Sequence, residues 1–173
     1  MNDKLLHIEQ VNTIDDYIED LADLLVQVVE DGASIGFLPP LLHHEALDYW
    51  DNLLNPDIRL WIAVQHERVV GTVQLHLCDK PNGKHRAEIA KLMTRPQHRR
   101  TGIGRALMSK AEVAAGSEGR SLLLLDTREG DSSNLLYRSI GYQQAGTIPS
   151  YARSANGNLD ATVLYYKLLE PNA

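Results

Sequence analysis

Residues 92–107, which read LMTRPQHRRTGIGRAL, combine residue types that could bind an anion. The segment runs from an apolar strand end through a Pro-containing loop into a predicted helix that begins at Gly102. The first amides of a helix have no intrahelical partner, and the helix dipole adds positive potential at that end. Gly102 and Gly104 lack side chains, so a phosphate could approach their backbone closely. Three arginines add positive charge to the same turn: Arg99, Arg100 and Arg105.

The same turn could also be an ordinary helix start with a solvated basic rim. It is not a dinucleotide-binding G-x-G-x-x-G sequence, because Leu107 occupies the position of the third glycine. The G-x-x-x-x-G-K-[ST] pattern of a P-loop is absent as well. From the residues alone, phosphate binding and a plain helix start both stay open.

The elements that would position this turn follow a mixed order. Apolar periodicity predicts the succession β-α-α-β-β-β-α-β-α-β-β, which is typical of a mixed α/β sheet layered with helices. The expected strands cover residues 5–11, 60–65, 69–77, 87–94, 121–127, a segment from 141, and 161–168. The expected helices cover residues 14–29, with Thr13 as cap, and residues 42–54, 102–117 and 134–139. Because residues 122–125 are all leucine, we expect the fifth strand to be central and buried on both faces.

Length and composition narrow the class of protein. The 173 residues suit a single domain over residues 1–173 with a sizeable core, and a net charge of −6 disfavours general nucleic-acid binding. The lone Cys78 excludes an intramolecular disulfide and a cysteine zinc cluster, and we expect it to be a buried small residue. The adjacent His43 and His44 have poor spacing for a metal, so none is predicted. No signal peptide or membrane span is apparent, which favours a cytoplasmic protein.

Two segments together resemble the GCN5-related N-acetyltransferase (GNAT) family. The pattern Arg99-x-x-Gly102-x-Gly104 after an apolar strand resembles its acyl-CoA signature, and residues 136–142, LYRSIGY, resemble its Leu-Tyr-x-x-x-Gly-aromatic segment. The resemblance implies an α/β fold, α+β in some schemes, with a mixed, mostly antiparallel central sheet, splayed central strands and helices on both faces. It also implies acetyl-CoA as cosubstrate, bound in the wedge between the splayed strands.

The resemblance assigns the cosubstrate contacts to three segments. Backbone groups of Leu92, Met93 and Thr94 would pair with the pantetheine arm, and one of these amides would polarise the thioester carbonyl. The pyrophosphate would lie against one turn, made of Arg99, Arg100, Thr101, Gly102, Ile103, Gly104 and Arg105. The third segment departs from the family, because Gly130 and Ser133 stand where many members have Asn and Ala. We expect Ser133 or Asn134 to replace the usual pantetheine contact.

Transfer of an acetyl group to an amine needs a base for the ammonium proton and an acid for the departing thiolate. Tyr137 matches the family's acid position, although it could simply be a core aromatic. Asp126 follows the leucine run and is a base candidate, against a cap or an ion pair with Arg128. Glu88 is the rival base, against a structural ion pair with Lys91 or a neighbouring arginine. Water is a third way to remove the proton.

The resemblance implies direct transfer to the primary amine of a small molecule, without an acetyl-Cys78 intermediate. Residues 31–38, 75–93 and 146–167 resemble the tabtoxin-resistance branch of the family, which implies a tabtoxin-like β-lactam amino acid as acceptor. Residues 84–86, KHR, could hold a substrate carboxylate or form a solvated turn. A protein N-terminus, a lysine or a polyamine is the alternative acceptor, and a non-catalytic acyl-CoA sensor is the alternative class. Neither nucleic acid nor a membrane is an expected partner, whereas an exposed edge strand near the C-terminus could pair two copies into a homodimer.

Overall fold

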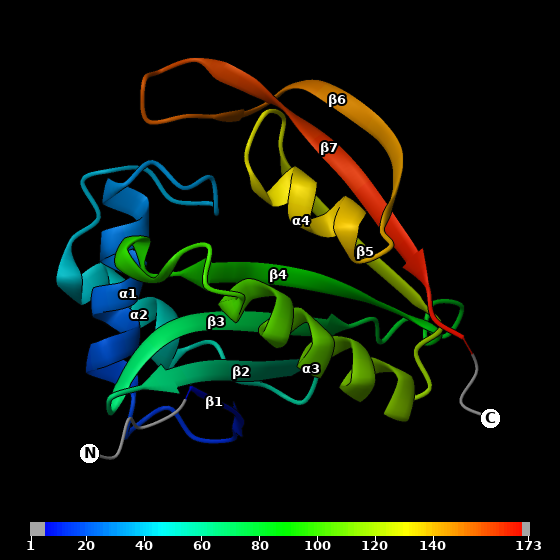
Figure 1. The fold of residues 1–173 in the computed structure, drawn as a ribbon, viewed down its shortest axis with the longest axis horizontal. Coiled ribbons are helices and arrows are strands. Elements are labelled where there is room, and N and C mark those ends of the chain that lie inside the picture. Colours follow the sequence, from blue (N-terminus) through cyan, green and yellow to red (C-terminus); the bar gives the residue numbers. More distant parts are fainter. Residues whose placement is uncertain (1–5, 171–173) are drawn as a thin grey trace.

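The computed structural model describes residues 6–170, whose strands form one seven-stranded sheet (Figure 1). The strands are β1 (His7–Val11), β2 (Ile58–Gln65), β3 (Arg68–Leu77), β4 (Arg86–Thr94), β5 (Leu122–Arg128), β6 (Gln143–Arg153) and β7 (Leu159–Leu168). Their order is β1-β2-β3-β4-β5-β7-β6, and every neighbouring pair is antiparallel except β4 and β5. The predicted succession of elements is confirmed, with a short 3-10 helix η1 (Pro96–His98) added after β4. Leu5, where the first strand was expected to begin, lies outside the described residues.

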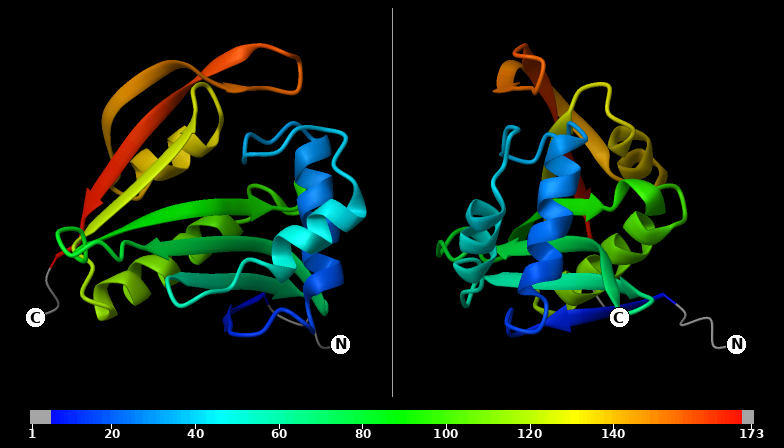
Figure 2. Two further views of the ribbon diagram at one scale, coloured as in Figure 1. Left: turned by 180° about the vertical axis from the view of Figure 1, so that it is seen from behind. Right: turned by 90° about the vertical axis from the view of Figure 1, so that its left-hand side faces the viewer.

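Helices cover both faces of the sheet (Figure 2). They are α1 (Ile18–Glu30), α2 (His43–Asp51), α3 (Ile103–Ser117) and α4 (Ser133–Ser139). The pair α1 and α2 packs on one face, and α3 and α4 pack on the other. Strand alternation separates the two cores, because Val73 and Leu75 of β3 are buried against α3 while Gln74 reaches Tyr49 of α2. The predicted mixed α/β fold with helices on both faces is therefore confirmed.

The first helix begins at Ile18, later than the expected start at residue 14. The prediction of a Thr13 cap was wrong, since Tyr17 is the N-cap residue and its own amide bonds to the carbonyl of Ile14 in a preceding turn. The Tyr17 hydroxyl donates to the Glu9 carboxylate on β1 at 2.6 Å, which ties this turn to the sheet. Ile14 is nevertheless buried in the same core as the apolar residues of α1. Its position therefore fits the helical spacing although it lies in the turn, which is why the helix was predicted to start too early. The second helix likewise ends early, at Asp51 instead of residue 54.

The expectation that β5 is buried on both faces was wrong. Leu123 and Leu125 are buried, but Leu124 is 36% exposed and Asp126 is exposed. The reason is that the core beneath α1 and α2 contains no residue of β5, so the face of β5 that bears Leu124 and Asp126 is not covered. In addition, β4 and β5 pair only from Arg86 to Glu88 and then diverge. The run of leucines therefore marks a central strand, and the predicted splaying of the two central strands is confirmed.

Strand β4 contains a bulge that the sequence did not predict. Thr72 of β3 lies opposite Met93 and Gln74 lies opposite Ala90, so β4 carries one residue more than β3 over this stretch. Within it, Lys91 has a φ of +50°, a backbone conformation that is uncommon for residues other than glycine. The bulge re-aims the side chains of β4 at the point where this strand has left β5.

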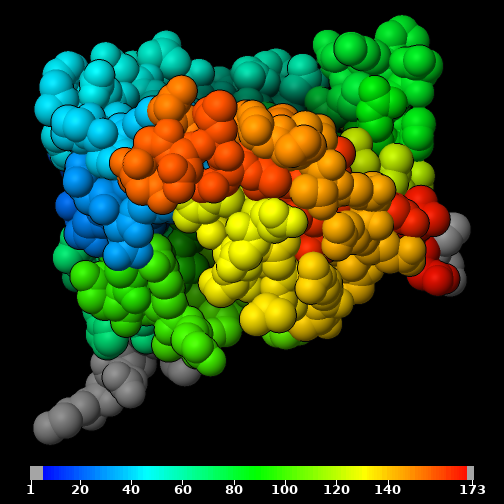
Figure 3. All heavy atoms as spheres, turned by 90° about the horizontal axis from the view of Figure 1, so that it is seen from above, coloured from blue at the N-terminus to red at the C-terminus, as the bar shows by residue number. Residues whose placement is uncertain are grey.

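Strand β6 is the edge of the sheet beside β7, so the prediction of an exposed edge strand near the C-terminus is confirmed. The β6–β7 hairpin extends over the end of α1 and the loop that follows it (Figures 1 and 3). Its tip exposes large apolar side chains, which include Ile148, Tyr151 and Leu159. Cys78 follows β3 and is partly exposed, so the expectation of a buried residue was wrong.

Candidate active site

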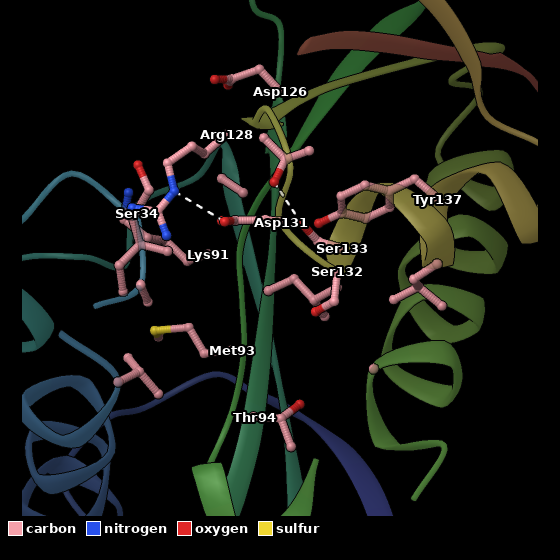
Figure 4. Close-up of a pocket in the computed structure, with 18 of the residues that line it drawn as sticks. Ser34, Lys91, Met93, Thr94, Asp126, Arg128, Asp131, Ser132, Ser133 and Tyr137 are labelled. Carbon is pink, nitrogen blue, oxygen red and sulfur yellow. Dashed lines mark hydrogen bonds and ion pairs between the residues drawn. The ribbon is translucent and has the colours of Figure 1, made fainter. Parts of the chain in front are cut away.

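A groove with a volume of about 970 Å³ opens where β4 and β5 diverge. One wall is β4, the other is β5 with α4, and the loop after α1 covers one side (Figure 4). The groove reaches the N-terminus of α3 on the α3–α4 side of the sheet. Most of the predicted site residues line it, and Thr101 and Asn134 are the two that do not.

The N-terminus of α3 forms the end of the groove where an anion was predicted. Gly102 is the N-cap residue with a φ of +88°, and apart from its chain neighbours no atom of the described residues lies within 4 Å of where its Cβ would be. Gly104 is required for a different reason, since its Cβ would lie 3.3 Å from a methyl group of Leu136 on α4. The two glycines thus combine an open approach to the helix amides with close packing of α3 and α4.

Two of the three arginines around this turn already have side-chain partners. Arg99 forms an ion pair with Asp31 at the end of α1, and Arg105 donates to the Ser139 hydroxyl at 2.8 Å. Arg99, Arg100 and Arg105 line the groove together with Ile103 and the two glycines. Thr101 instead donates its hydroxyl to the carbonyl of His98 at 2.6 Å, so its side chain stabilises the turn.

Leu92, Met93 and Thr94 form the β4 wall of the groove, beyond the last residue of β4 that pairs with β5. Their backbone groups on the β5 side are therefore released from strand pairing. Met93 is held from the other side by its pairing with Thr72. This edge of β4 can hydrogen-bond an extended ligand lying between the strands, as an additional strand would.

The two expected replacements for the pantetheine contact lie in different surroundings. Ser133 lines the groove, and its hydroxyl lies 2.6 Å from the hydroxyl of Thr127. Asn134 is buried, its amide donates to the carbonyls of Arg128 and Asp131 at 2.9 Å, and its oxygen accepts from the Tyr165 hydroxyl at 2.8 Å. The structure brings Ser133 to the groove and not Asn134.

Tyr137 is both a core residue and a groove residue. Its ring lies 5.9 Å from that of Tyr142 and 6.0 Å from that of Tyr165, centroid to centroid, and it is only 6% exposed. Its hydroxyl points from α4 into the groove (Figure 4). Burial, and then the nearby Asp126 carboxylate, raise the pKa of Tyr137 far above its ordinary value. The phenol therefore stays protonated and can act only as an acid at neutral pH.

Glu88 and Asp126 project from the same face of the sheet, since Glu88 lies opposite Leu124 and Asp126 is two residues further along β5. The walls of the groove raise the pKa of Glu88 by burial, Asp126 raises it further, and Lys91 lowers it. Asp126 accepts a hydrogen bond from the Thr162 hydroxyl of β7 at 2.7 Å. The structure thus brings both base candidates into one chamber on the α1–α2 side of the sheet.

The alternative ion pairs considered for these carboxylates do not form among residues 6–170. Asp126 does not pair with Arg128, whose guanidinium donates to Asp131 at 3.0 Å, to the Ser154 hydroxyl at 3.0 Å and to the carbonyl of Gly32 at 3.1 Å. Arg128 thereby connects β5, the loop after α1 and the β6–β7 hairpin. Glu88 has no basic group within 4.0 Å in this part of the chain. Both carboxylates are available to a ligand.

Sequence reasoning missed the roles of Lys91 and Arg128. An arginine two residues after a candidate base, followed by Asp131, is the pattern that could have suggested a local ion pair. No pattern indicated the bulge at Lys91. Lys84 and His85 lie in the turn before β4 and are exposed, Arg86 is the first residue of β4, and none of the three lines the groove.

Neither a metal-binding cluster nor a membrane-spanning helix is present in the described part of the chain. No group of three or more His, Cys, Asp and Glu side chains among residues 6–170 could hold a metal ion. None of the helices in this range is long and apolar enough to cross a membrane.

Solved acetyltransferases share the fold. The chain superposes on a GNAT-family acetyltransferase from Streptococcus pneumoniae with a TM-score of 0.80 and 17% identity, covering 95% of this chain and 100% of that one. A structure from Salmonella typhimurium, solved with its cofactor acetyl-CoA, gives a TM-score of 0.79 and 15% identity, covering 97% and 96%. At these identities the superpositions establish the fold alone.

Sequence comparisons establish the family. The chain is 32% identical over 133 residues to "IAA acetyltransferase" of Azospirillum brasilense, covering 76% of this chain and 84% of that one. It is 29% identical to a mouse "Probable N-acetyltransferase family 8 member 5", covering 71% of this chain but 55% of the mouse protein. The model of the Acetyltransferase (GNAT) family matches residues 26–142. The chain therefore belongs to the GNAT family of acetyltransferases and is an acetyl-CoA-dependent N-acetyltransferase.

Proposed function

We propose that this enzyme moves the acetyl group of acetyl-CoA directly to the primary amine of a small molecule. One observation carries the proposal: two carboxylates without ion-pair partners among residues 6–170 and one protonated tyrosine meet in the groove between the diverged strands. Their positions on either side of that groove suit a base for the amine and an acid for the leaving thiolate. The same arrangement speaks against a non-catalytic sensor, which would need neither group.

The groove fits acetyl-CoA in two respects. Gly102 leaves the first amides of α3 open to a phosphate, and Arg99, Arg100 and Arg105 surround that point. The released edge of β4 at Leu92, Met93 and Thr94 offers backbone groups to an extended arm, and Ser133 faces it from α4. Acetyl-CoA supplies the activated acetyl thioester. An amide of the β4 edge would hydrogen-bond the thioester carbonyl as negative charge develops there.

The proton path uses the residues that converge in the groove. An alkylammonium has a pKa of about 10 and must lose a proton before it can attack. Glu88, Asp126 or a water held by them takes that proton, and the pKa of Glu88, raised above the ordinary glutamate value, makes this carboxylate a stronger base. Tyr137 donates its phenolic proton to the departing sulfur. Attack of the amine and loss of the thiolate leave the acetyl group on nitrogen and the proton of Tyr137 on the CoA sulfur. The acylated nitrogen then loses its second proton, which restores the Tyr137 phenol, and the proton held by the carboxylate passes to solvent.

Direct transfer is favoured over a cysteine intermediate by the position of Cys78. This residue follows β3, its amide bonds to the carbonyl of Arg86, and its sulfur does not line the groove. A Cys78→Ala variant should keep its turnover. Loss of turnover in a folded Cys78→Ala protein would contradict direct transfer.

A small acceptor is favoured because one side of the groove is covered. This is the side that holds Glu88 and Asp126, and it is called the acceptor side below. The loop after α1 and the β6–β7 hairpin are joined there through Arg128. A protein N-terminus or a lysine side chain would have to pass between these two segments to reach the groove. Proteins and peptides are therefore kept as the alternative acceptors. One structure with the same fold, from Brucella melitensis, is named as a ribosomal-protein-alanine N-acetyltransferase. The narrower acceptor, a tabtoxin-like β-lactam amino acid, stays a prediction of the sequence, as does a cytoplasmic location.

Calorimetric titration with acetyl-CoA, with ATP and NAD as controls, tests the cosubstrate site. Release of free CoA thiol with panels of small amines and of peptides then tests the acceptor. We expect selective binding of acetyl-CoA and faster turnover with small amines. Turnover confined to peptides would favour the alternative acceptors, and binding without turnover of any amine would favour a sensor.

A further inference from the structure

Lys91 is the one cation of the acceptor side of the groove, within residues 6–170, that has no ion-pair partner. Arg128 is engaged by Asp131, Ser154 and the carbonyl of Gly32. The Lys91 ammonium has no carboxylate within 4.0 Å in the described part of the chain and makes no hydrogen bond there. The side chain is nevertheless partly buried, which is costly for a charge without a partner.

The bulge of β4 is what directs this side chain. Lys91 has a φ of +50°, and such strain persists only where the surrounding structure enforces it. Its Nζ lies 3.5 Å from where a Cβ of Gly36 would be, so the ammonium reaches across to the loop after α1. The backbone carbonyl of Lys91 accepts from the Thr72 hydroxyl at 3.1 Å, which holds the bulge from the β3 side. The ammonium is thus placed at the edge of the chamber that holds the two carboxylates.

The charges in this chamber are complementary to a zwitterion. Glu88 and Asp126 both act electrostatically on Lys91, so all three groups lie close to one another. An incoming ammonium is attracted by the two carboxylates but repelled by Lys91. The incoming ammonium competes with Lys91 for these two carboxylates, so Lys91, which forms an ion pair with neither, gains a counter-ion of its own only if the acceptor brings one. A carboxylate attached next to the amine supplies that counter-ion.

We infer that Lys91 is a specificity-determining residue that binds the carboxylate of an amino acid acceptor while Glu88 and Asp126 receive its amine. The inference rests on the proposed function and narrows it from small amines to amines that carry a neighbouring carboxylate. The ammonium of Lys91 and the acceptor carboxylate form a charge-assisted hydrogen bond. This contact also orients the amine toward the two carboxylates.

The test compares matched acceptors with matched variants. The common α-amino acids and their primary amides are assayed with the wild-type enzyme, Lys91→Met and Lys91→Arg. Lys110→Met on the exposed face of α3 is the control for removal of a lysine. An amide differs from its acid in amine pKa as well as in charge. Comparing the acid-to-amide ratio of kcat/KM between enzymes cancels that difference.

We expect the acid-to-amide ratio of kcat/KM to fall at least about tenfold in Lys91→Met, the effect of losing one charge-assisted contact. Lys91→Arg should keep most of the ratio, Lys110→Met should keep all of it, and the affinity for acetyl-CoA should not change. An unchanged ratio in Lys91→Met, or faster turnover of amides than of acids by the wild-type enzyme after correction for amine pKa, overturns the inference. If Lys91→Met does not fold, the other two enzymes provide the test. A preference for acids over amides in both the wild type and Lys91→Arg supports the inference, and its absence in the wild type overturns it.

The two levels of the proposal fail differently. Acetylation of amines without preference for a carboxylate overturns the role of Lys91 and leaves the proposed function in place. Absence of turnover with every amine, despite binding of acetyl-CoA, overturns both.

Discussion

The two ends of the groove are built in different ways. At the α3 end, one continuous turn of residues 99–105 provides helix amides, two glycines and three arginines. At the acceptor end, single side chains come from β4, β5, the loop after α1 and the β6–β7 hairpin. The first end uses backbone groups, which any sequence of suitable conformation provides. The second depends on side-chain identity, so it is where acceptor specificity can change while the donor stays the same.

The largest effect should follow from removing the acid between the two ends. Tyr137→Phe keeps the ring contacts with Tyr142 and Tyr165 and removes only the hydroxyl. We expect kcat to fall about 10²-fold or more, since general acid catalysis contributes that much, while the affinity for acetyl-CoA is retained. Tyr142→Phe is the matched control, because Tyr142 packs against Tyr137 but does not line the groove. Equal kcat in Tyr137→Phe and wild type would remove Tyr137 from this role.

The pH profile should separate the two carboxylates. A base works only when it is deprotonated, so kcat/KM falls as the pH drops through the pKa of the base. This fall is the acidic limb of the pH profile. The raised pKa of Glu88 places the limb above the ordinary glutamate range. Asp126→Asn removes a charge that raises the pKa of Glu88, so the limb should move to lower pH. Glu88→Gln should lower kcat about 10²-fold and abolish the limb if Glu88 is the base. A limb that survives in Glu88→Gln and disappears in Asp126→Asn would assign the base to Asp126.

Glycine substitutions at the two ends of α3 test whether the phosphate end depends on the backbone. Gly102 and Gly119 both have positive φ, +88° and +73°, and neither has an atom within 4 Å of its missing Cβ. Alanine at either position should reduce the free energy of unfolding by about 1–2 kcal/mol, measured by denaturant titration. Only Gly102→Ala should weaken acetyl-CoA, by about tenfold in Kd, because its methyl group obstructs the approach to the helix amides. Equal affinity in both variants would show that the turn is an ordinary helix start.

The same contrast explains what the sequence could predict. The turn at residues 99–105 and the segment around Tyr137 are local patterns, and their strand and helix context was recoverable from periodicity. Asn134 was misplaced because its position in sequence is next to Ser133, whereas its amide is used by Arg128, Asp131 and Tyr165. The chamber around Lys91 depends on a one-residue bulge and on contacts between distant segments. Neither leaves a signal in the spacing of residues along the chain.

The smallest predicted effect concerns the support of the acceptor end. Arg128→Lys cannot keep three separate hydrogen bonds to Asp131, Ser154 and the carbonyl of Gly32, because an ammonium lacks the guanidinium's fixed planar geometry. The loop after α1 and the β6–β7 hairpin should then be held less firmly, which raises KM for the acceptor about threefold to tenfold, the effect of about one hydrogen bond. The Kd of acetyl-CoA should not change. Arg153→Lys on the same hairpin is the control, because within residues 6–170 the Arg153 guanidinium bonds only the carbonyl of Gly157. A matching loss of acetyl-CoA affinity would mean that the two ends are mechanically coupled through Arg128, and their independence would have to be abandoned.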